Sequence, residues 1–241
     1  MEGLRIVHLS DIHYGLYLSD RSLHRILDLT MAQHPDLIAI TGDFVTQSHV
    51  FIEPVCEMLA ALNAPLGVWA VLGNHDFRAG AERLTAGLRR RNIHVLRNQR
   101  ETLQHAGARF QIAGIDDSRQ HPDVAATLGH AQPGPAWRRR GRAELTRPTA
   151  ESALFTLLLA HNPLELEAAA ECGVDLVLSG HTHGGQIKLG FAAPLYQRYL
   201  PAGFLSQGET QMYVSRGLGQ VIVPMRVNAP PELAVLNLHG G

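Results

Sequence analysis

Five short polar motifs, each placed directly after an apolar run, constrain the fold of this chain most strongly. The apolar runs are short and continuous, as in strands that are buried on both faces of a parallel sheet. Segments with the period of an amphipathic helix separate several of the runs. The polar motifs are Asp11-Ile-His13, Gly42-Asp43, Gly73-Asn74-His75-Asp76, His161-Asn162-Pro163 and Gly180-His181-Thr182-His183.

The first half of the chain alternates strand and helix patterns. Such a βαβαβ order predicts a mostly parallel sheet. Proline and glycine bound the strand patterns, and a serine or aspartate precedes the first helical pattern as a plausible N-cap. We expect strands at 4–9, 36–40 and 67–72, and helices at 19–33, 51–62 and 81–91.

The second half has a different texture. Two runs flank Ala106-Gly107-Ala108 and predict a hairpin of residues 101–104 and 109–115. Residues 116–150 are rich in Pro, Gly, Arg and Ala, so we expect a long loop there, either a lid or an insertion. We interpret residues 1–241 as a single domain built on two sheets. Its other expected elements are strands at 154–160, 174–178, 212–215 and 233–238 and helices at 121–128 and 163–171.

Composition excludes several classes of protein. The chain has 241 residues and a formal net charge of −1, so nothing indicates a nucleic-acid partner. Cys56 and Cys172 stand in helical contexts and are interpreted as buried thiols of a protein from a reducing compartment. No apolar stretch reaches the ~20 residues of a membrane span, and no signal peptide precedes the first strand. We therefore expect a cytoplasmic location.

The polar motifs carry the residue types of a metal site. Open α/β sheets bind ligands beyond the carboxyl ends of their strands, so these motifs are expected to meet in one crevice. Their carboxylate, amide and imidazole groups suit Mn, Fe, Zn, Co or Mg, and no cysteine joins them. Each motif alone also fits an ordinary turn or a core histidine. Together they predict a hydrolytic site for two metals.

The motifs resemble those of the calcineurin-like metallophosphoesterases, in particular the bacterial YkuE/YaeI-type branch. The resemblance covers nearly the whole chain. It is most specific at Ser179-Gly180-His181-Thr182-His183-Gly184-Gly185-Gln186, and it continues at Ser215-Arg216-Gly217-Leu218-Gly219 and Pro230-Pro231-Glu232. It implies an α/β fold, a four-layer αββα sandwich of two mixed β-sheets flanked by helices.

The resemblance also implies a role for each residue of the site. Two divalent metal ions are implied, with manganese favoured. Asp43 would bridge them, His75 would protonate or stabilise the leaving oxygen, and Asp76 would orient a neighbouring group. One metal would be bound by Asp11, His13 and His183, and the other by Asn74, His161 and His181.

Three functions are compatible with these residues. The first is hydrolysis of a phosphodiester or pyrophosphate bond by water activated between the metals, with UDP-2,3-diacylglucosamine of lipid A synthesis as the candidate substrate. The second is a phosphomonoesterase acting on small molecules or proteins. The third is a non-catalytic metal-binding scaffold. The expected partner is a small-molecule or lipid-linked phosphodiester, with a peripheral contact on the cytoplasmic face of the inner membrane. The oligomeric state is left open.

Four further features have a functional and a structural interpretation. Arg138-Arg139-Arg140 and Arg142 beside Trp137 would bind a phosphate or a lipid surface, although a solvated loop is the favoured interpretation. Residues 191–205 would line an acyl or nucleoside pocket, or form a core or lid segment. Asp116-Asp117 resemble an Asp pair of the YkuE/YaeI-type branch, and a hairpin-end turn explains them equally well. Arg89-Arg90-Arg91 ends a helix, where cations complement the dipole.

Overall fold

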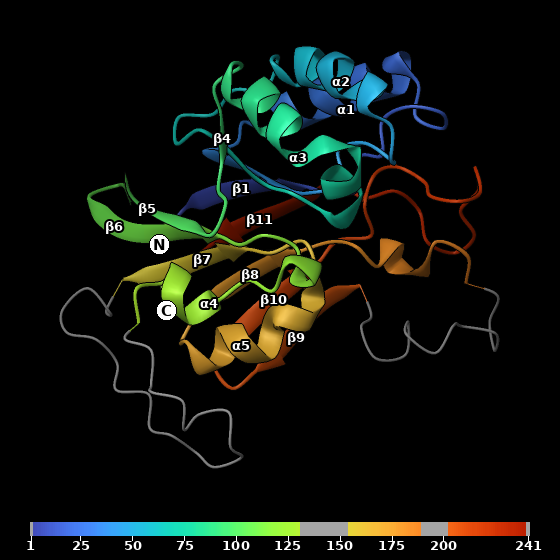
Figure 1. The fold of residues 1–241 in the computed structure, drawn as a ribbon. Helices are drawn as coiled ribbons and strands as arrows, with labels where there is room; N and C mark the ends of the chain where they lie inside the picture. The colour runs from blue at the N-terminus through green and yellow to red at the C-terminus, as the bar shows by residue number, and fades with distance from the viewer. Residues whose placement is uncertain (1, 131–153, 189–201, 240–241) are drawn as a thin grey trace.

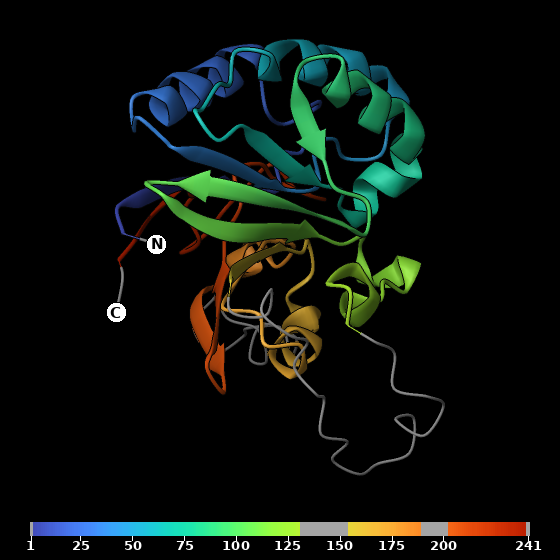
Figure 2. The same ribbon diagram turned by 90° about the vertical axis from the view of Figure 1, so that its left-hand side faces the viewer.

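The structure is a computed structural model that describes residues 2–130, 154–188 and 202–239. Two β-sheets lie face to face, and helices cover the outer face of each sheet (Figures 1 and 2). Helices α1, α2 and α3 form the upper layer in Figure 1, and α4 and α5 lie beneath the second sheet. The predicted four-layer αββα sandwich is therefore confirmed.

The first sheet has the strand order β11-β1-β2-β3-β4. Strands β1 to β4 are parallel, as the alternating patterns predict, and β11 joins β1 antiparallel. Strand β4 is too short to give a periodic signal and was not predicted. The elements are β1 (Leu4–Leu9), α1 (Asp20–Met31), β2 (Leu37–Thr41), α2 (Ile52–Leu59), β3 (Val68–Val71), α3 (Asn74–Arg89), β4 (Ile93–Val95) and β11 (Ala234–Leu238).

The second sheet has the order β5-β6-β7-β8-β10-β9. The predicted hairpin is confirmed as the antiparallel pair β5–β6, and β6, β7, β8 and β10 are parallel. Strand β9 pairs antiparallel with β10 at the edge and was not predicted. The elements are β5 (Gln99–His105), β6 (Ala108–Gly114), α4 (Val124–Thr127), β7 (Phe155–Leu159), α5 (Leu166–Glu171), β8 (Leu176–Ser179), β9 (Gly203–Gln207) and β10 (Thr210–Val214).

Alternation along the strands explains why four layers form. In β1, Leu4 and Ile6 belong to the cluster between the sheets, whereas Val7 and Leu9 belong to the cluster under the helices. In β7, Leu157 packs between the sheets. Successive side chains of a strand point to opposite faces, so a strand that is apolar throughout must be covered on both sides.

Helix α3 corrects one prediction. It begins at Asn74, not at residue 81, so the Gly73-Asn74-His75-Asp76 motif opens a helix and is not a loop. The Asp76 carboxylate accepts the N–H of Gly73 at 2.9 Å and caps this first turn. Gly80 interrupts the helix with φ of 133°, and this break hides the turns before it from a periodicity analysis.

Several predictions fall wholly or partly outside the described residues. These are the arginine cluster at 138–142 with Trp137, most of segment 191–205, and the larger part of the proposed lid. Where the chain is described, Asp116 is buried and accepts bonds from Arg97 at 2.5 and 3.1 Å, as a hairpin-end structure predicts. Both cysteines are free thiols. Among the described residues, no helix combines the length and apolar character needed to span a bilayer.

Candidate metal centre

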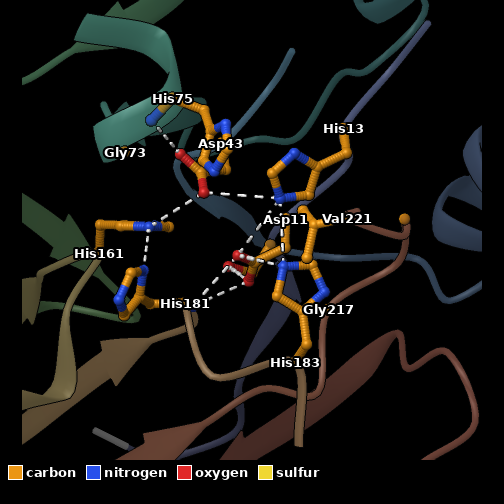
Figure 3. Close-up of polar contacts among 12 residues, drawn as sticks. Asp11, His13, Asp43, Gly73, His75, His161, His181, His183, Gly217 and Val221 are labelled. Atoms are coloured by element: carbon orange, nitrogen blue, oxygen red, sulfur yellow. Dashed lines mark hydrogen bonds and ion pairs between the residues drawn. The ribbon is translucent and has the colours of Figure 1, made fainter. Parts of the chain in front are cut away.

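The predicted ligands lie at the carboxyl ends of strands from both sheets. Asp11 follows β1, Asp43 follows β2, and Asn74 follows β3 in the first sheet. His161 follows β7 and His181 follows β8 in the second. The two sheets present these ends at the same edge of the sandwich, so residues far apart in sequence converge at one site (Figure 3).

Six of the seven predicted metal ligands fall into two clusters in the structure, and Asn74 is the seventh. Within each cluster the ligand atoms lie within 4.8 Å of one another. Asn74 is 5% exposed, and its Oδ1 has no hydrogen-bond partner among the described residues. A buried amide oxygen without a partner is costly unless it binds a cation. The clusters are Asp11 with His13 and His183, and Asp43 with His161 and His181.

Asp43 belongs to the second cluster and also reaches the first. Its Oδ2 is 3.3 Å from Nε2 of His161 and 3.5 Å from Nε2 of His13. The ring nitrogens inside each cluster also approach closely, with His13 Nε2 at 3.1 Å from His183 Nε2. Lone pairs this close repel unless a proton or a metal ion lies between them. A cation in either cluster would reduce this repulsion. Asp43 Oδ2 lies close to both clusters and could therefore contact a cation in each.

The backbone is strained at most of these ligands. A positive φ is uncommon for residues other than glycine and costs about 1–2 kcal/mol each. Such strain clusters at functional sites, where the surrounding structure over-determines it. The ligands with this conformation are Asp11 (φ 51°), His13 (46°), Asp43 (54°), His181 (68°) and His183 (52°).

Two glycines allow the ligand loops to approach one another. A Cβ on Gly180 would collide with Ser10 Oγ and with the Asp11 carboxylate. A Cβ on Gly73 would collide with the Asp43 carboxylate and its backbone nitrogen. Glycine is therefore required at both positions by close contact, since each faces a metal-ligand candidate directly.

The electrostatics of the centre favour a cation. Burial acts to raise the pKa of Asp43, but His161 and His13 outweigh it and hold that pKa well below its usual range. Burial acts to lower the pKa of His161, but the charge and hydrogen bond of Asp43 raise it to about 10. Burial lowers the pKa of His13 to about 3. Two buried carboxylates face these imidazoles, and His161 would release its proton on binding an ion, so the group forms a suitable site for divalent metal ions.

Neighbouring groups fix the histidine rings. His161 Nδ1 lies 2.7 Å from the carbonyl oxygen of Thr41, so it donates there and leaves Nε2 available toward Asp43. Arg226 Nη2 lies 3.2 Å from His183 Nδ1, and the same guanidinium donates to the carbonyls of Arg216 and Gly219. Arg226 was missed, because it lies in an irregular loop that carries no recognisable motif.

His75 and Asp76 occupy different environments. The backbone N–H of His75 donates to Asp43 Oδ1 at 2.9 Å. The ring Nδ1 of His75 contacts the carbonyl of Thr46, and the ring lies edge-on to that of His13, with 5.0 Å between the ring centroids. Asp76 is fully buried and accepts N–H bonds from the backbone around Gly73 and Asp43. His75 is therefore partly exposed beside the candidate ligands, whereas Asp76 is buried beneath the ligand loops.

This buried set of carboxylate, amide and imidazole groups at the edge of two stacked sheets has the composition of the metal sites used by metal-dependent hydrolases, and two groups within it could each hold a metal ion. A family model described as calcineurin-like phosphoesterase matches residues 4–185. The chain is 33% identical to the uncharacterized metallophosphoesterase YkuE of Bacillus subtilis, over 98% of this chain and 79% of YkuE. It therefore belongs to the calcineurin-like phosphoesterase family, as predicted, and is an enzyme of the metallophosphoesterase class.

Other comparisons agree. The chain is 29% identical to phosphodiesterase YaeI of Escherichia coli, over 97% of this chain and 82% of YaeI. It spans only 60% of a Helicobacter pylori relative, also an uncharacterized metallophosphoesterase, at 32% identity. The NAD nucleotidase NadN of Haemophilus influenzae shares the fold, with a TM-score of 0.53 and 18% identity, over 89% of this chain and 45% of NadN.

Proposed function

We propose that this chain is a dinuclear metal-dependent phosphodiesterase that hydrolyses phosphodiester or pyrophosphate bonds. The observation that carries the proposal is the position of Asp43, whose Oδ2 faces His13 of one cluster and His161 of the other. A shared carboxylate of this kind suits two adjacent metals. The relative named phosphodiesterase YaeI supports a diester substrate.

The residues fit such a pair of metals. Asp11, His13 and His183 would hold one ion, Asn74, His161 and His181 the other, and Asp43 both. When bound, the ions would supply Lewis acidity toward the phosphate oxygens and an activated water. Manganese is the favoured ion, although the ligand set also suits Fe, Zn, Co or Mg.

The protein itself supplies orientation and a proton. The Thr46 carbonyl contacts Nδ1 of His75 and fixes the ring, so Nε2 is the nitrogen available to a leaving oxygen. The backbone N–H of His75 donates to Asp43 Oδ1 at 2.9 Å. This bond keeps Oδ2 of the same carboxylate directed at His13 and His161. A histidine beside the departing oxygen suits general-acid catalysis near neutral pH.

The substrate proposal is more specific than the class. We propose a lipid-linked diester such as UDP-2,3-diacylglucosamine, hydrolysed at its pyrophosphate by a cytoplasmic enzyme that contacts the membrane peripherally. A phosphomonoesterase is the second candidate, because the same ligands would serve both reactions. A non-catalytic scaffold is the least favoured, because His75 and all seven ligand positions are intact in the sequence.

The test compares diester and monoester hydrolysis by the manganese-reconstituted protein. We expect bis(p-nitrophenyl) phosphate to be hydrolysed faster than p-nitrophenyl phosphate, and UMP to be released from UDP-2,3-diacylglucosamine. A reversed preference would favour the phosphomonoesterase. Hydrolysis of the model diester without UMP release would retain the chemistry and reject this lipid substrate. If none of these three substrates is hydrolysed, the non-catalytic scaffold becomes the favoured function.

A further inference from the structure

Two loops beside the metal centre are apolar and uncharged. Residues 14–18 follow the ligand His13, and residues 219–225 contain no Asp, Glu, Lys or Arg. Exposed loops are normally polar, because apolar side chains gain nothing from contact with water. We define the apolar rim as the four exposed side chains on these loops, namely Leu16 (81% exposed), Tyr17 (38%), Ile222 (88%) and Met225 (51%).

The first loop follows the ligand candidate His13 directly, and hydrogen bonds attach the second loop to the segments that carry Asp11 and His183. The N–H of Gly219 donates to the carbonyl of Asp11 at 2.7 Å. The Gln186 amide bonds both the N–H of Val221, at 2.9 Å, and its carbonyl, at 2.8 Å. Gly219 lies against His13, since a Cβ on Gly219 would come within 2.9 Å of the His13 Cβ. The second loop therefore begins beside the ligand candidates Asp11 and His13, and Ile222 lies three residues further along it.

The rim is a defined surface and not two independent loop tips. The Tyr17 hydroxyl donates to the Ile222 carbonyl at 3.3 Å and joins the loops. Ile222 has φ of 64°, a strained conformation for a β-branched residue. A strained and exposed isoleucine stabilises neither its loop nor the core. A contact outside the described residues would give this side chain a function.

We propose that the apolar rim inserts into a lipid surface and presents the metal centre to phosphodiesters at the headgroup level. Four side chains offer well under the roughly 800 Å² per partner of a stable protein interface. A bilayer, by contrast, accepts a few inserted residues, and tyrosine is favoured at its interface. The absence of charge on both loops agrees with burial among acyl chains. The inference deepens the proposed function and rests on it.

The test is sedimentation of the manganese-loaded protein with sucrose-loaded phosphatidylcholine vesicles, which carry no net charge. We expect the wild-type protein to bind the vesicles and the Leu16→Ser/Ile222→Asn variant to bind them about 100-fold more weakly. Each lost apolar side chain should reduce the affinity about tenfold. Asparagine suits the left-handed conformation of residue 222. The matched control is Leu29→Ser, since Leu29 is 48% exposed on α1 and lies outside the rim. This control should bind like the wild type.

A second measurement separates this inference from the proposed function. Hydrolysis of water-soluble bis(p-nitrophenyl) phosphate should be unchanged in the double variant, because neither residue is a ligand candidate. Equal vesicle binding by the double variant and the wild type would overturn the inference. So would binding that requires anionic lipid and disappears in high salt, because charge would then drive it. A wild-type protein that does not hydrolyse the model diester would reject the proposed function. Vesicle binding would then still test whether the apolar rim inserts into lipid.

Discussion

Asp76 accepts the backbone N–H of Asp43 at 2.8 Å, and the carboxylate that makes this bond is fully buried. The same side chain accepts the N–H groups of Phe44, Val45 and Gly73. Burial, and then the charge of Asp43, act to raise the pKa of Asp76, while the N–H groups of Gly73 and Val45 oppose that rise and favour the carboxylate. Asp76 thus holds the two loops of Asp43 and Gly73 together from a fully buried position.

We expect Asp76→Asn to weaken both the fold and the metal centre. The amide would present N–H₂ to backbone N–H donors, leaving buried groups without partners at about 1–3 kcal/mol each. Urea unfolding of the metal-free protein should show a loss of about 2–4 kcal/mol, with weaker manganese binding. Asp123→Asn is the control, because asparagine also caps a helix and should preserve the α4 cap. Unchanged stability of Asp76→Asn would contradict the assigned role.

His75→Ala should impair catalysis without removing metal. The ring supplies a proton donor and not a ligand, so we expect kcat to fall about 10²-fold or more. Metal content, measured by mass spectrometry, should equal that of the wild type. His105→Ala on β5 is the control, and its kcat should not change. A metal-depleted His75→Ala protein would show instead that the residue maintains the metal centre.

His181→Asn tests whether ligand geometry costs stability. His181 has φ of 68°, which asparagine adopts more readily than histidine. In the metal-free protein, we expect the free energy of unfolding to stay equal or rise by up to about 1 kcal/mol. Manganese binding should fall sharply at the same time. A large loss of stability without metal would mean that the ring is needed for packing.

The sequence predicts much of the fold because its strand runs are continuous and its strand-ending motifs are explicit. Apolar runs at β1, β2, β7 and β8 have to be buried on both faces, which leads to two sheets under two helical layers. Strand β4 was missed because three residues carry no periodicity, and β9 because it is an exposed edge. The first turns of α3 were missed because Gly80 breaks the pattern.

The candidate ligands were predictable because motifs mark them, whereas a neighbour that acts through backbone carbonyls carries no such motif. Asp11, Asp43 and His183 stand in motifs, and the structure brings them together with the other ligands. Arg226 acts through carbonyl oxygens and His183 Nδ1, a role that depends on three-dimensional position alone. The left-handed conformations of the ligands are likewise imposed by tertiary contacts, since no local sequence rule requires them at aspartate or histidine.

Arg226→Met should therefore weaken the cluster that contains His183 more than the cluster that contains His161. Methionine fills similar volume but cannot donate to the carbonyls of Arg216 and Gly219. Calorimetric titration with manganese should show one affinity reduced about tenfold or more and the other nearly unchanged. Arg97→Met, which removes a guanidinium remote from the ligands, should leave both affinities unaltered. Equal weakening of both sites by Arg226→Met would reject this local role.

The most direct test of the central claim is the number of manganese ions bound by each chain, measured by calorimetry on metal-free protein alongside diester hydrolysis. We predict two ions for the wild type, one for His183→Ala, one for His161→Ala, and weakened binding of both for Asp43→Ala. Hydrolysis should require both ions. A wild-type protein that binds a single ion, or that hydrolyses diesters fully with one, would contradict the dinuclear centre.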